Sequence, residues 1–256
     1  MTLKIMTGNI GSGKSLIASK LAKMDHVIVN MDTIQQMISG GEYGKYDSNK
    51  KDIYQATEIA AIESALKAGL SVVVDRTNMD KKRRSTFIDV GKKYAKEIIS
   101  INFGEGTQEG LERRYKNSKG IPEEVWRSVY TYMKKSYEPP CMDEGFDSII
   151  EAPKRFRFHA FDFDGTISKN NFPEIGEILD STVEKMNALW EDLSNIIIVW
   201  SCRSGNYENQ MKAFLLKNKI PFDFINENPV FETYGRKIFA HQYYDDRNAT
   251  MITQST

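Results

Sequence analysis

Short runs of consecutive apolar residues, rich in Val and Ile, recur along the first half of the chain. They stand at residues 3–7, 27–30, 70–75 and 98–103. Such continuous runs are typical of parallel strands that are buried on both faces. Between them lie segments with apolar residues at helical spacing, among them one from Asp52 toward Ala68 and one that begins at Lys81. Alternating strands and helices predict an α/β domain with a parallel sheet.

The same alternation resumes after a polar, proline-containing break at residues 151–155, where we place a domain boundary. Apolar runs at 156–161 and 195–200 predict two further parallel strands, and a third should end just before Asp245. The pattern therefore predicts two domains, residues 1–152 and 153–256, each a parallel sheet flanked by helices.

One further helix is expected after Pro122, where apolar residues recur at helical spacing and predict a packing face. These residues are Val125, Val129, Met133 and Tyr137.

Composition narrows the classes of function. The 256 residues include 40% apolar residues, enough for packed cores, and 35 Lys and Arg against 35 Asp and Glu. A net charge of zero argues against a protein that coats a nucleic acid, but not against one that handles its end. The cysteines, Cys141 and Cys202, form neither a disulfide framework nor a metal-binding spacing. With no signal peptide or membrane span in view, we expect a cytoplasmic protein.

A glycine-rich loop, G-N-I-G-S-G-K-S, stands between the first predicted strand and a helix. Its members are Gly8, Asn9, Ile10, Gly11, Ser12, Gly13, Lys14 and Ser15. The glycines let backbone N–H groups converge on one anion, and the following helix adds its positive end. Lys14 can reach the outer phosphates and the Ser15 hydroxyl can bind Mg²⁺. The loop predicts binding of a nucleoside triphosphate.

Acidic residues follow the next two strands, at the sheet edge where α/β proteins place their chemistry. Asp32 can accept the proton of an attacking hydroxyl, or it can cap the helix that starts near Thr33. Asp75 can hold Mg²⁺-bound water or orient the acceptor.

Two basic segments lie on the same edge. The run Lys81 to Arg84 is either a phosphate contact or a solvated helix face. The second group, Arg113, Arg114 and Lys116, can close over a triphosphate or form a solvated helix end.

These motifs together resemble the kinase domain of phage polynucleotide 5′-kinases, over about residues 1 to 150. The resemblance implies ATP and Mg²⁺ at Lys14 and Ser15, Asp32 as general base, and a lid cation among Arg113, Arg114 and Lys116. Residues expected to face the acceptor are Gln35, Asp75, Thr77, Asn78 and Arg84. Gln35 stands where the family often has an Arg that contacts an acceptor phosphate, and Arg76 separates Asp75 from Thr77.

The second half carries D-F-D-G-T at a predicted strand end, with Asp162 and Asp164 two residues apart. Mg²⁺ can relieve the repulsion between such carboxylates. One can be phosphorylated while the other acts as acid and then base. An Asx-turn is the structural alternative. Further along the chain stand Ser201, Arg203, Lys237, Asp245 and Asp246. A hydroxyl can hold a phosphoryl oxygen, a lysine can neutralise a phosphoaspartate, and an Asp pair can complete a Mg²⁺ shell.

This set resembles the haloacid dehalogenase superfamily over about residues 156 to 248. The resemblance implies Asp162 as nucleophile, Asp164 as acid/base and Ser201 on the phosphoryl group. It implies that Lys237 steadies that group and that Asp245 or Asp246 joins Asp162 on Mg²⁺. The short interval between Asp164 and Ser201 leaves little room for a cap domain, so we expect an open site.

The two halves in this order resemble phage polynucleotide 5′-kinase/3′-phosphatases over nearly the full length. The resemblance implies healing of RNA or DNA ends for a ligase, by an enzyme that can be a homo-oligomer. A kinase/phosphatase of a nucleoside, nucleotide or other small metabolite is the alternative, and a nucleotide-gated scaffold without enzymatic activity is a third.

Overall fold

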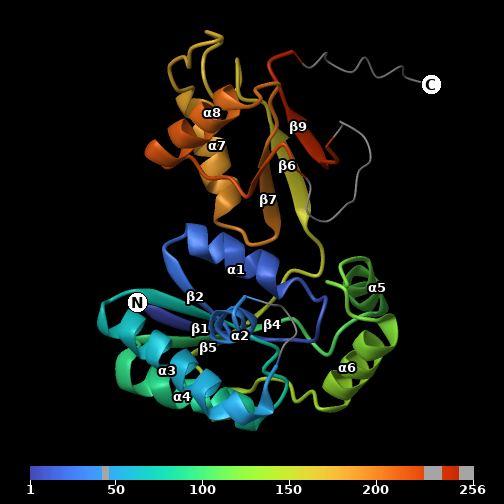
Figure 1. Ribbon diagram of the computed structural model, residues 1–256. Coiled ribbons are helices and arrows are strands. Elements are labelled where there is room, and N and C mark those ends of the chain that lie inside the picture. The colour runs from blue at the N-terminus through green and yellow to red at the C-terminus, as the bar shows by residue number, and fades with distance from the viewer. Residues whose placement is uncertain (42–45, 228–237, 248–256) are drawn as a thin grey trace, which may run out of the picture. The chain divides into compact units, whose positions relative to one another are not determined.

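The computed structural model describes residues 1–41, 46–227 and 238–247. The chain forms two compact units, Met1–Ala152 and Pro153–Thr256, divided where the sequence places the domain boundary. Each contains a parallel sheet accompanied by helices (Figure 1). The predicted α/β class with parallel sheets is therefore confirmed.

The first unit is built on a five-stranded sheet in the order β2-β3-β1-β4-β5. Its strands are β1 (Thr2–Thr7), β2 (His26–Asn30), β3 (Ser71–Asp75), β4 (Glu97–Asn102) and β5 (Ser148–Glu151). All neighbours pair in parallel. In this arrangement β1 lies in the middle of the sheet, so the loop that follows it emerges at the centre of the edge formed by the carboxyl ends of the strands.

Helices connect these strands and pack on the sheet. They are α1 (Lys14–Lys23), α2 (Met31–Ser39), α3 (Lys51–Lys67), α4 (Lys81–Tyr94), α5 (Gln108–Lys116) and α6 (Glu123–Lys135), with single 3₁₀ turns η1 (Ser48–Lys50) and η2 (Met142–Glu144). The core joins Leu3 and Ile5 of β1 with Val72 of β3, Ile62 of α3 and Phe87 of α4, all at most 2% exposed. Burying such side chains stabilises the fold by about 1.5–3 kcal/mol each.

Helix α6 corrects one expectation. Its buried residues are Trp126 and Tyr130. Of the predicted packing face, Val125 is 47% exposed, while Val129, Met133 and Tyr137 are half-buried. Both sets have helical spacing, and they differ in phase by one residue. The aromatic pair is the one buried because it offers more apolar surface.

The second unit has a four-stranded sheet in the order β8-β7-β6-β9. Its elements are β6 (Arg157–Phe161), α7 (Asp180–Trp190), β7 (Asn195–Val199), α8 (Asn206–Lys217), β8 (Phe224–Ile225) and β9 (Gln242–Tyr244). Phe161, Ile197 and Val199 pack against Met186 of α7 and Met211 of α8. One helix, α7, lies between Asp164 and Ser201, as the sequence predicts.

Within the described ranges, no helix combines the length and the apolar character of a membrane span.

His159 on β6 provides a test of this packing. It is 6% exposed, and its Nε2 lies 3.1 Å from Asn195 Oδ1, to which it donates. Burial lowers the pKa of His159 below its usual value of 6.5. The unfolded chain therefore binds this proton more readily than the folded chain, and protonation costs stability as the pH falls through 6.5.

We expect the urea midpoint of wild type to fall more between pH 7.5 and 5.5 than that of His159→Gln, because the variant has no titratable side chain at position 159. Equal slopes in wild type and His159→Gln would contradict this assignment.

Candidate active sites

The loop after β1 is held in place by backbone contacts that tolerate little side-chain volume. Gly8 N–H donates to Thr77 O at 2.8 Å. Gly11 has φ of +69°, and a Cβ there would lie 1.9 Å from Gly110 O at the start of α5. Helix α5 therefore packs directly on the loop, and only glycine fits at position 11.

Lys14 lies inside this loop and is 8% exposed. Its Nζ donates to Gly8 O at 2.9 Å, to Asn9 O at 2.6 Å and to Ser12 Oγ at 3.3 Å. Burial lowers the pKa of Lys14 to about 8, with the Arg114 charge acting the same way, while the charges of Asp75 and Asp32 oppose the shift. The loop thus contains a desolvated cation that an anionic ligand would stabilise.

The ends of β2 and β3 are joined around Asp75, which is 7% exposed. Ser15 Oγ donates to Asp75 Oδ2 at 3.2 Å. Asn30 Nδ2 donates to the same oxygen at 3.0 Å and to the Asp75 carbonyl at 3.1 Å. A hydroxyl and a carboxylate side by side are the oxygen donors that Mg²⁺ prefers, so Ser15 and Asp75 fit such an ion.

Asp32 does not cap α2. The N-cap is Asn30, whose Oδ1 accepts from Thr33 N–H at 3.0 Å, and Asp32 sits exposed in the first turn. The capping alternative for Asp32 is therefore wrong. Its carboxylate lies close enough to influence the pKa of Lys14.

The predicted lid cations, Arg113, Arg114 and Lys116, lie in the last turn of α5. Arg113 Nη2 donates to Gly11 O at 3.0 Å, and Lys116 is exposed. The Arg114 guanidinium stacks on the Trp126 ring at 3.8 Å, and Trp126 Nε1 donates to Ser118 O at 3.1 Å. Sequence reasoning missed Trp126 because it placed the neighbouring Val125 on the buried face. The ring supports Arg114 near the loop.

Two residues expected to face the acceptor are instead part of the interior. Asn78 is 1% exposed and its Nδ2 donates to Met6 O at 2.9 Å. Arg84 is fully buried and forms a bidentate pair with Glu144 at 2.8 and 2.7 Å. It also donates to the carbonyls of Asn78 and Glu138. The structure therefore corrects the predicted substrate role of Asn78 and Arg84, because both are buried and hold parts of the first unit together. Gln35 and Thr77 are half-buried near the sheet edge.

Arg84 gives a direct test of that correction. Because Arg84→Met leaves the Glu144 charge buried and without its partner, we expect the unfolding free energy to fall by about 3–5 kcal/mol. Arg83→Met should cost less than about 1 kcal/mol, since Arg83 pairs with Asp80 at the surface. Equal urea midpoints for both variants and wild type would contradict the bracing role.

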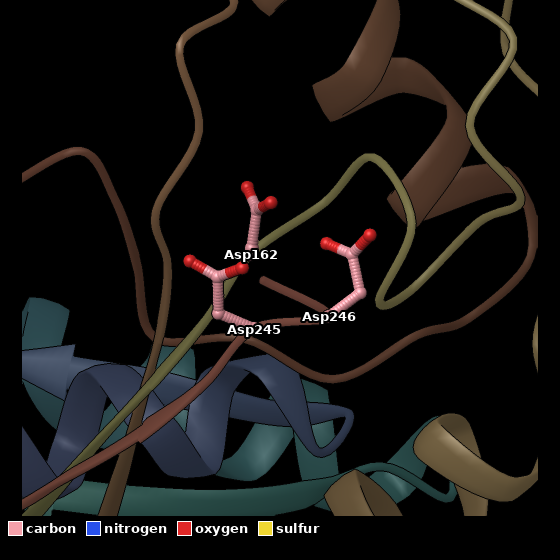
Figure 2. Close-up of side chains that lie close together, drawn as sticks. All are labelled: Asp162, Asp245 and Asp246. Carbon is pink, nitrogen blue, oxygen red and sulfur yellow. The ribbon is translucent and has the colours of Figure 1, made fainter. Parts of the chain in front are cut away.

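In the second unit three carboxylates converge. Oxygens of Asp162, Asp245 and Asp246 all lie within 4.8 Å of one another, and Figure 2 shows the three side chains pointing the same way. Asp162 follows β6, and the pair follows β9. Gly165, with φ of +91°, allows the approach, since a Cβ there would lie 2.6 Å from the Asp246 carboxylate. The Asp246 N–H donates to Thr166 Oγ1 at 3.0 Å.

The electrostatics of this cluster favour a cation. Desolvation raises the pKa of Asp162 to about 6, the charges of Asp245, Asp164 and Asp246 add to the rise, and the Phe163 N–H opposes it. A divalent cation would relieve this repulsion, so the three carboxylates fit Mg²⁺.

Asp164 is held elsewhere. Both its oxygens accept from Arg203, Oδ2 from Nε at 2.8 Å and Oδ1 from Nη2 at 2.7 Å. Arg203 is 2% exposed and also donates to the carbonyls of Pro173 and Glu174. The Asp164 side chain therefore lies outside the carboxylate cluster, although the sequence pairs it with Asp162 around Mg²⁺, and Arg203 holds it in place.

Ser201 lies at the end of β7, where Asn226 Oδ1 accepts from its N–H at 2.9 Å. Its Oγ accepts from the Arg203 N–H at 3.2 Å. Sequence reasoning gave Asn226 no role because β8, which precedes it, is only two residues long. Lys237 lies outside the described residues.

Comparisons with known proteins address the first unit most directly. The chain is 27% identical over 157 residues to the bifunctional polynucleotide phosphatase/kinase of Schizosaccharomyces pombe, covering 58% of this chain and 33% of that protein. It spans about a third of that relative's length.

Among solved structures it is similar to the Pnkp1/Rnl/Hen1 RNA repair complex, with a TM-score of 0.45 and 20% identity over 88% of this chain and 78% of that one. It is also similar to a fungal RNA kinase, with a TM-score of 0.43 and 16% identity over 75% and 87%.

The predicted glycine loop and the parallel sheet around it agree with the family assignment. The AAA domain family AAA_33 matches residues 3–140, more than half of the 256 residues. The chain therefore belongs to the AAA domain family AAA_33, and its first unit is a P-loop nucleotide-binding domain of the kinase type.

Proposed function

We propose that this chain is an end-healing enzyme. Residues 1–152 transfer the γ-phosphate of ATP to 5′-hydroxyl ends of RNA or DNA, and residues 153–256 remove 3′-phosphates as a haloacid dehalogenase-like phosphatase. The observation that carries the proposal is the convergence of Asp162, Asp245 and Asp246 on a chain that also has the phosphate-binding loop around Lys14. Each unit thus has its own set of groups suited to phosphoryl transfer.

In the kinase reaction, Lys14 and the loop N–H groups bind the phosphates, and Asp32 accepts the proton of the attacking 5′-hydroxyl. The oxygen–phosphorus bond to the γ-phosphoryl forms as the bond to ADP breaks. Arg114, held by Trp126, neutralises charge on the transferred group. Ser15 and Asp75 would hold Mg²⁺, which screens the negative charge of the phosphates.

In the phosphatase reaction, Asp162 attacks the 3′-phosphate, and the ester bond to the 3′-oxygen breaks as the aspartyl phosphate forms. Asp164 gives a proton to the leaving 3′-oxygen and then takes one from the water that hydrolyses the aspartyl phosphate. Each Asp164 oxygen accepts one hydrogen bond from Arg203 and keeps a second lone pair that can carry the transferred proton. Ser201 contacts a phosphoryl oxygen, and Asp162, Asp245 and Asp246 would hold Mg²⁺.

The substrate class rests on a separate argument. The similarity to a polynucleotide phosphatase/kinase, 27% over 157 residues, supports polynucleotide ends as substrates. A ligase is the class of enzyme that would act next on ends with a 5′-phosphate and a 3′-hydroxyl. A kinase/phosphatase of a nucleoside, nucleotide or small metabolite is the second candidate. The net charge of zero favours it, because no basic surface is implied.

Two variants should separate the centres. Lys14→Ala should lower transfer from radiolabelled ATP to a 5′-hydroxyl oligonucleotide by about 10²–10³-fold or more, because a preorganised cation is lost. Lys14→Ala should leave phosphate release from a 3′-phosphorylated oligonucleotide intact. Asp162→Asn should abolish that phosphate release and leave transfer from ATP intact.

In each variant, the activity that is retained shows that the unit without the substitution is still folded. Loss of both activities in either variant would contradict independent centres, and labelling of nucleosides but not oligonucleotides would favour the second candidate.

A further inference from the structure

Two exposed aromatic side chains in the second unit lie beside Arg203, the residue that holds Asp164. Phe172 is 58% exposed, Tyr207 in the first turn of α8 is 42% exposed, and their ring centroids lie 5.3 Å apart. We call Phe172 and Tyr207 the aromatic pair. Neither residue has a role in the reactions described so far. Neighbouring apolar side chains that stay exposed in a folded unit often mark a binding site.

Phe172 stands near the middle of a loop, residues 168–178, whose two ends are joined. Lys169 N–H donates to the Glu177 carbonyl at 2.8 Å, and Lys169 Nζ donates to Glu177 Oε2 at 2.6 Å. Gly176 packs closely on the same part of the loop, because a Cβ there would lie 2.1 Å from the Lys169 carbonyl oxygen. These contacts close the loop at its base and present Phe172 at its far end.

Arg203 joins this end of the loop to the proposed acid/base group. Its Nη1 donates to Pro173 O at 3.0 Å and its Nη2 donates to Glu174 O at 2.8 Å, while the same guanidinium holds both oxygens of Asp164. Its Cζ lies 5.2 Å from the centre of the Phe172 ring, a distance at which a cation attracts the ring face. Phe172 is therefore held one side chain away from Asp164.

A flat, uncharged surface at this place suits a nucleobase. Aromatic side chains bind the bases of single-stranded nucleic acids by stacking, because every base has a π-face. One ribose ring separates a nucleobase from its own 3′-phosphate. A nucleotide whose 3′-phosphate is attacked by Asp162 can therefore rest its base on the aromatic pair. A phosphate ester without an aromatic ring would gain nothing from these two side chains.

We propose that Phe172 and Tyr207 form a stacking site for the base of the nucleotide whose 3′-phosphate is removed. The second unit then prefers 3′-phosphorylated ends that carry a terminal base over abasic ends and over small phosphate esters without an aromatic ring. This inference rests on the proposed phosphatase reaction, and it names the part of the substrate, beyond the phosphate, that the site recognises.

Fluorescence tests the inference without turnover. The probe is the 3′,5′-bisphosphate of 2-aminopurine riboside, which has no 5′-hydroxyl for the kinase reaction and whose fluorescence falls when the base stacks on an aromatic ring. The parent protein is the full chain with Asp162→Asn, which cannot form the aspartyl phosphate, and a non-hydrolysable ATP analogue is present. We expect the parent to quench the probe. Adding Phe172→Leu should remove the quenching and weaken binding at least about five-fold, as the loss of one base stack implies.

Two further variants of the parent separate stacking from other effects. Phe172→Trp keeps an aromatic face and should retain both the quenching and the affinity. Phe239→Leu is the matched control, since Phe239 is a 41% exposed phenylalanine of the same unit whose ring contacts His241, with centroids 5.1 Å apart. It should behave as the parent does. No quenching by the parent, quenching that Phe172→Leu leaves unchanged, or loss of quenching in Phe172→Trp would each overturn the inference.

Turnover by the chain without Asp162→Asn gives a second readout. The KM for a 3′-phosphorylated oligonucleotide should be at least about five-fold lower with a terminal base than with an abasic terminal residue. The kcat values should be similar, because stacking stabilises the ground state and the transition state alike. Phe172→Leu should remove the difference in KM, and equal KM values before that substitution would overturn the inference. Absence of phosphate release from every substrate would instead contradict the proposed phosphatase reaction, and the quenching measurement would still decide the inference.

Discussion

Charge that is buried at the carboxyl ends of parallel strands, and only partly balanced by the protein, is the constraint on which both units depend. In the first unit burial lowers the pKa of Lys14 to about 8, and in the second it raises the pKa of Asp162 to about 6. The shifts have opposite directions and the same cause, since desolvation favours the neutral form of each group. The site at Lys14 therefore favours an anion, and the site at Asp162 favours a cation. Phosphoryl-transfer reactions that use Mg²⁺ provide a phosphate anion for the first site and a metal cation for the second.

The surrounding fold maintains this imbalance. Gly11 allows the Gly110 carbonyl to approach the loop, because a Cβ at position 11 would lie 1.9 Å from its oxygen. Gly165 allows the Asp246 carboxylate to approach, because a Cβ there would lie 2.6 Å from it. A neutral group satisfies part of the charge in the first unit, where the Asn30 side chain donates to the Asp75 carboxylate. By contrast, Arg84 with Glu144 and Arg203 with Asp164 are fully paired, so these arginines hold other groups in place.

Features set by neighbouring residues were predictable from sequence. The phosphate-binding loop and the strand that leads to Asp162 depend on local patterns, and the parallel sheets follow from the alternation of strands and helices. The burial of Arg84 was not predictable, because its partner Glu144 lies in a turn far along the chain. The two-residue β8 is too short to give a pattern.

The proposed function requires two chemically different centres, of which only the second forms an aspartyl phosphate. The direct measurement is an acid quench of the enzyme with a 3′-phosphorylated oligonucleotide labelled in that phosphate, and separately with γ-labelled ATP, followed by peptide mapping. The account predicts a base-labile label on Asp162 from the oligonucleotide and none from ATP. Label from ATP on Asp162, or no protein-bound label from the oligonucleotide, would contradict it.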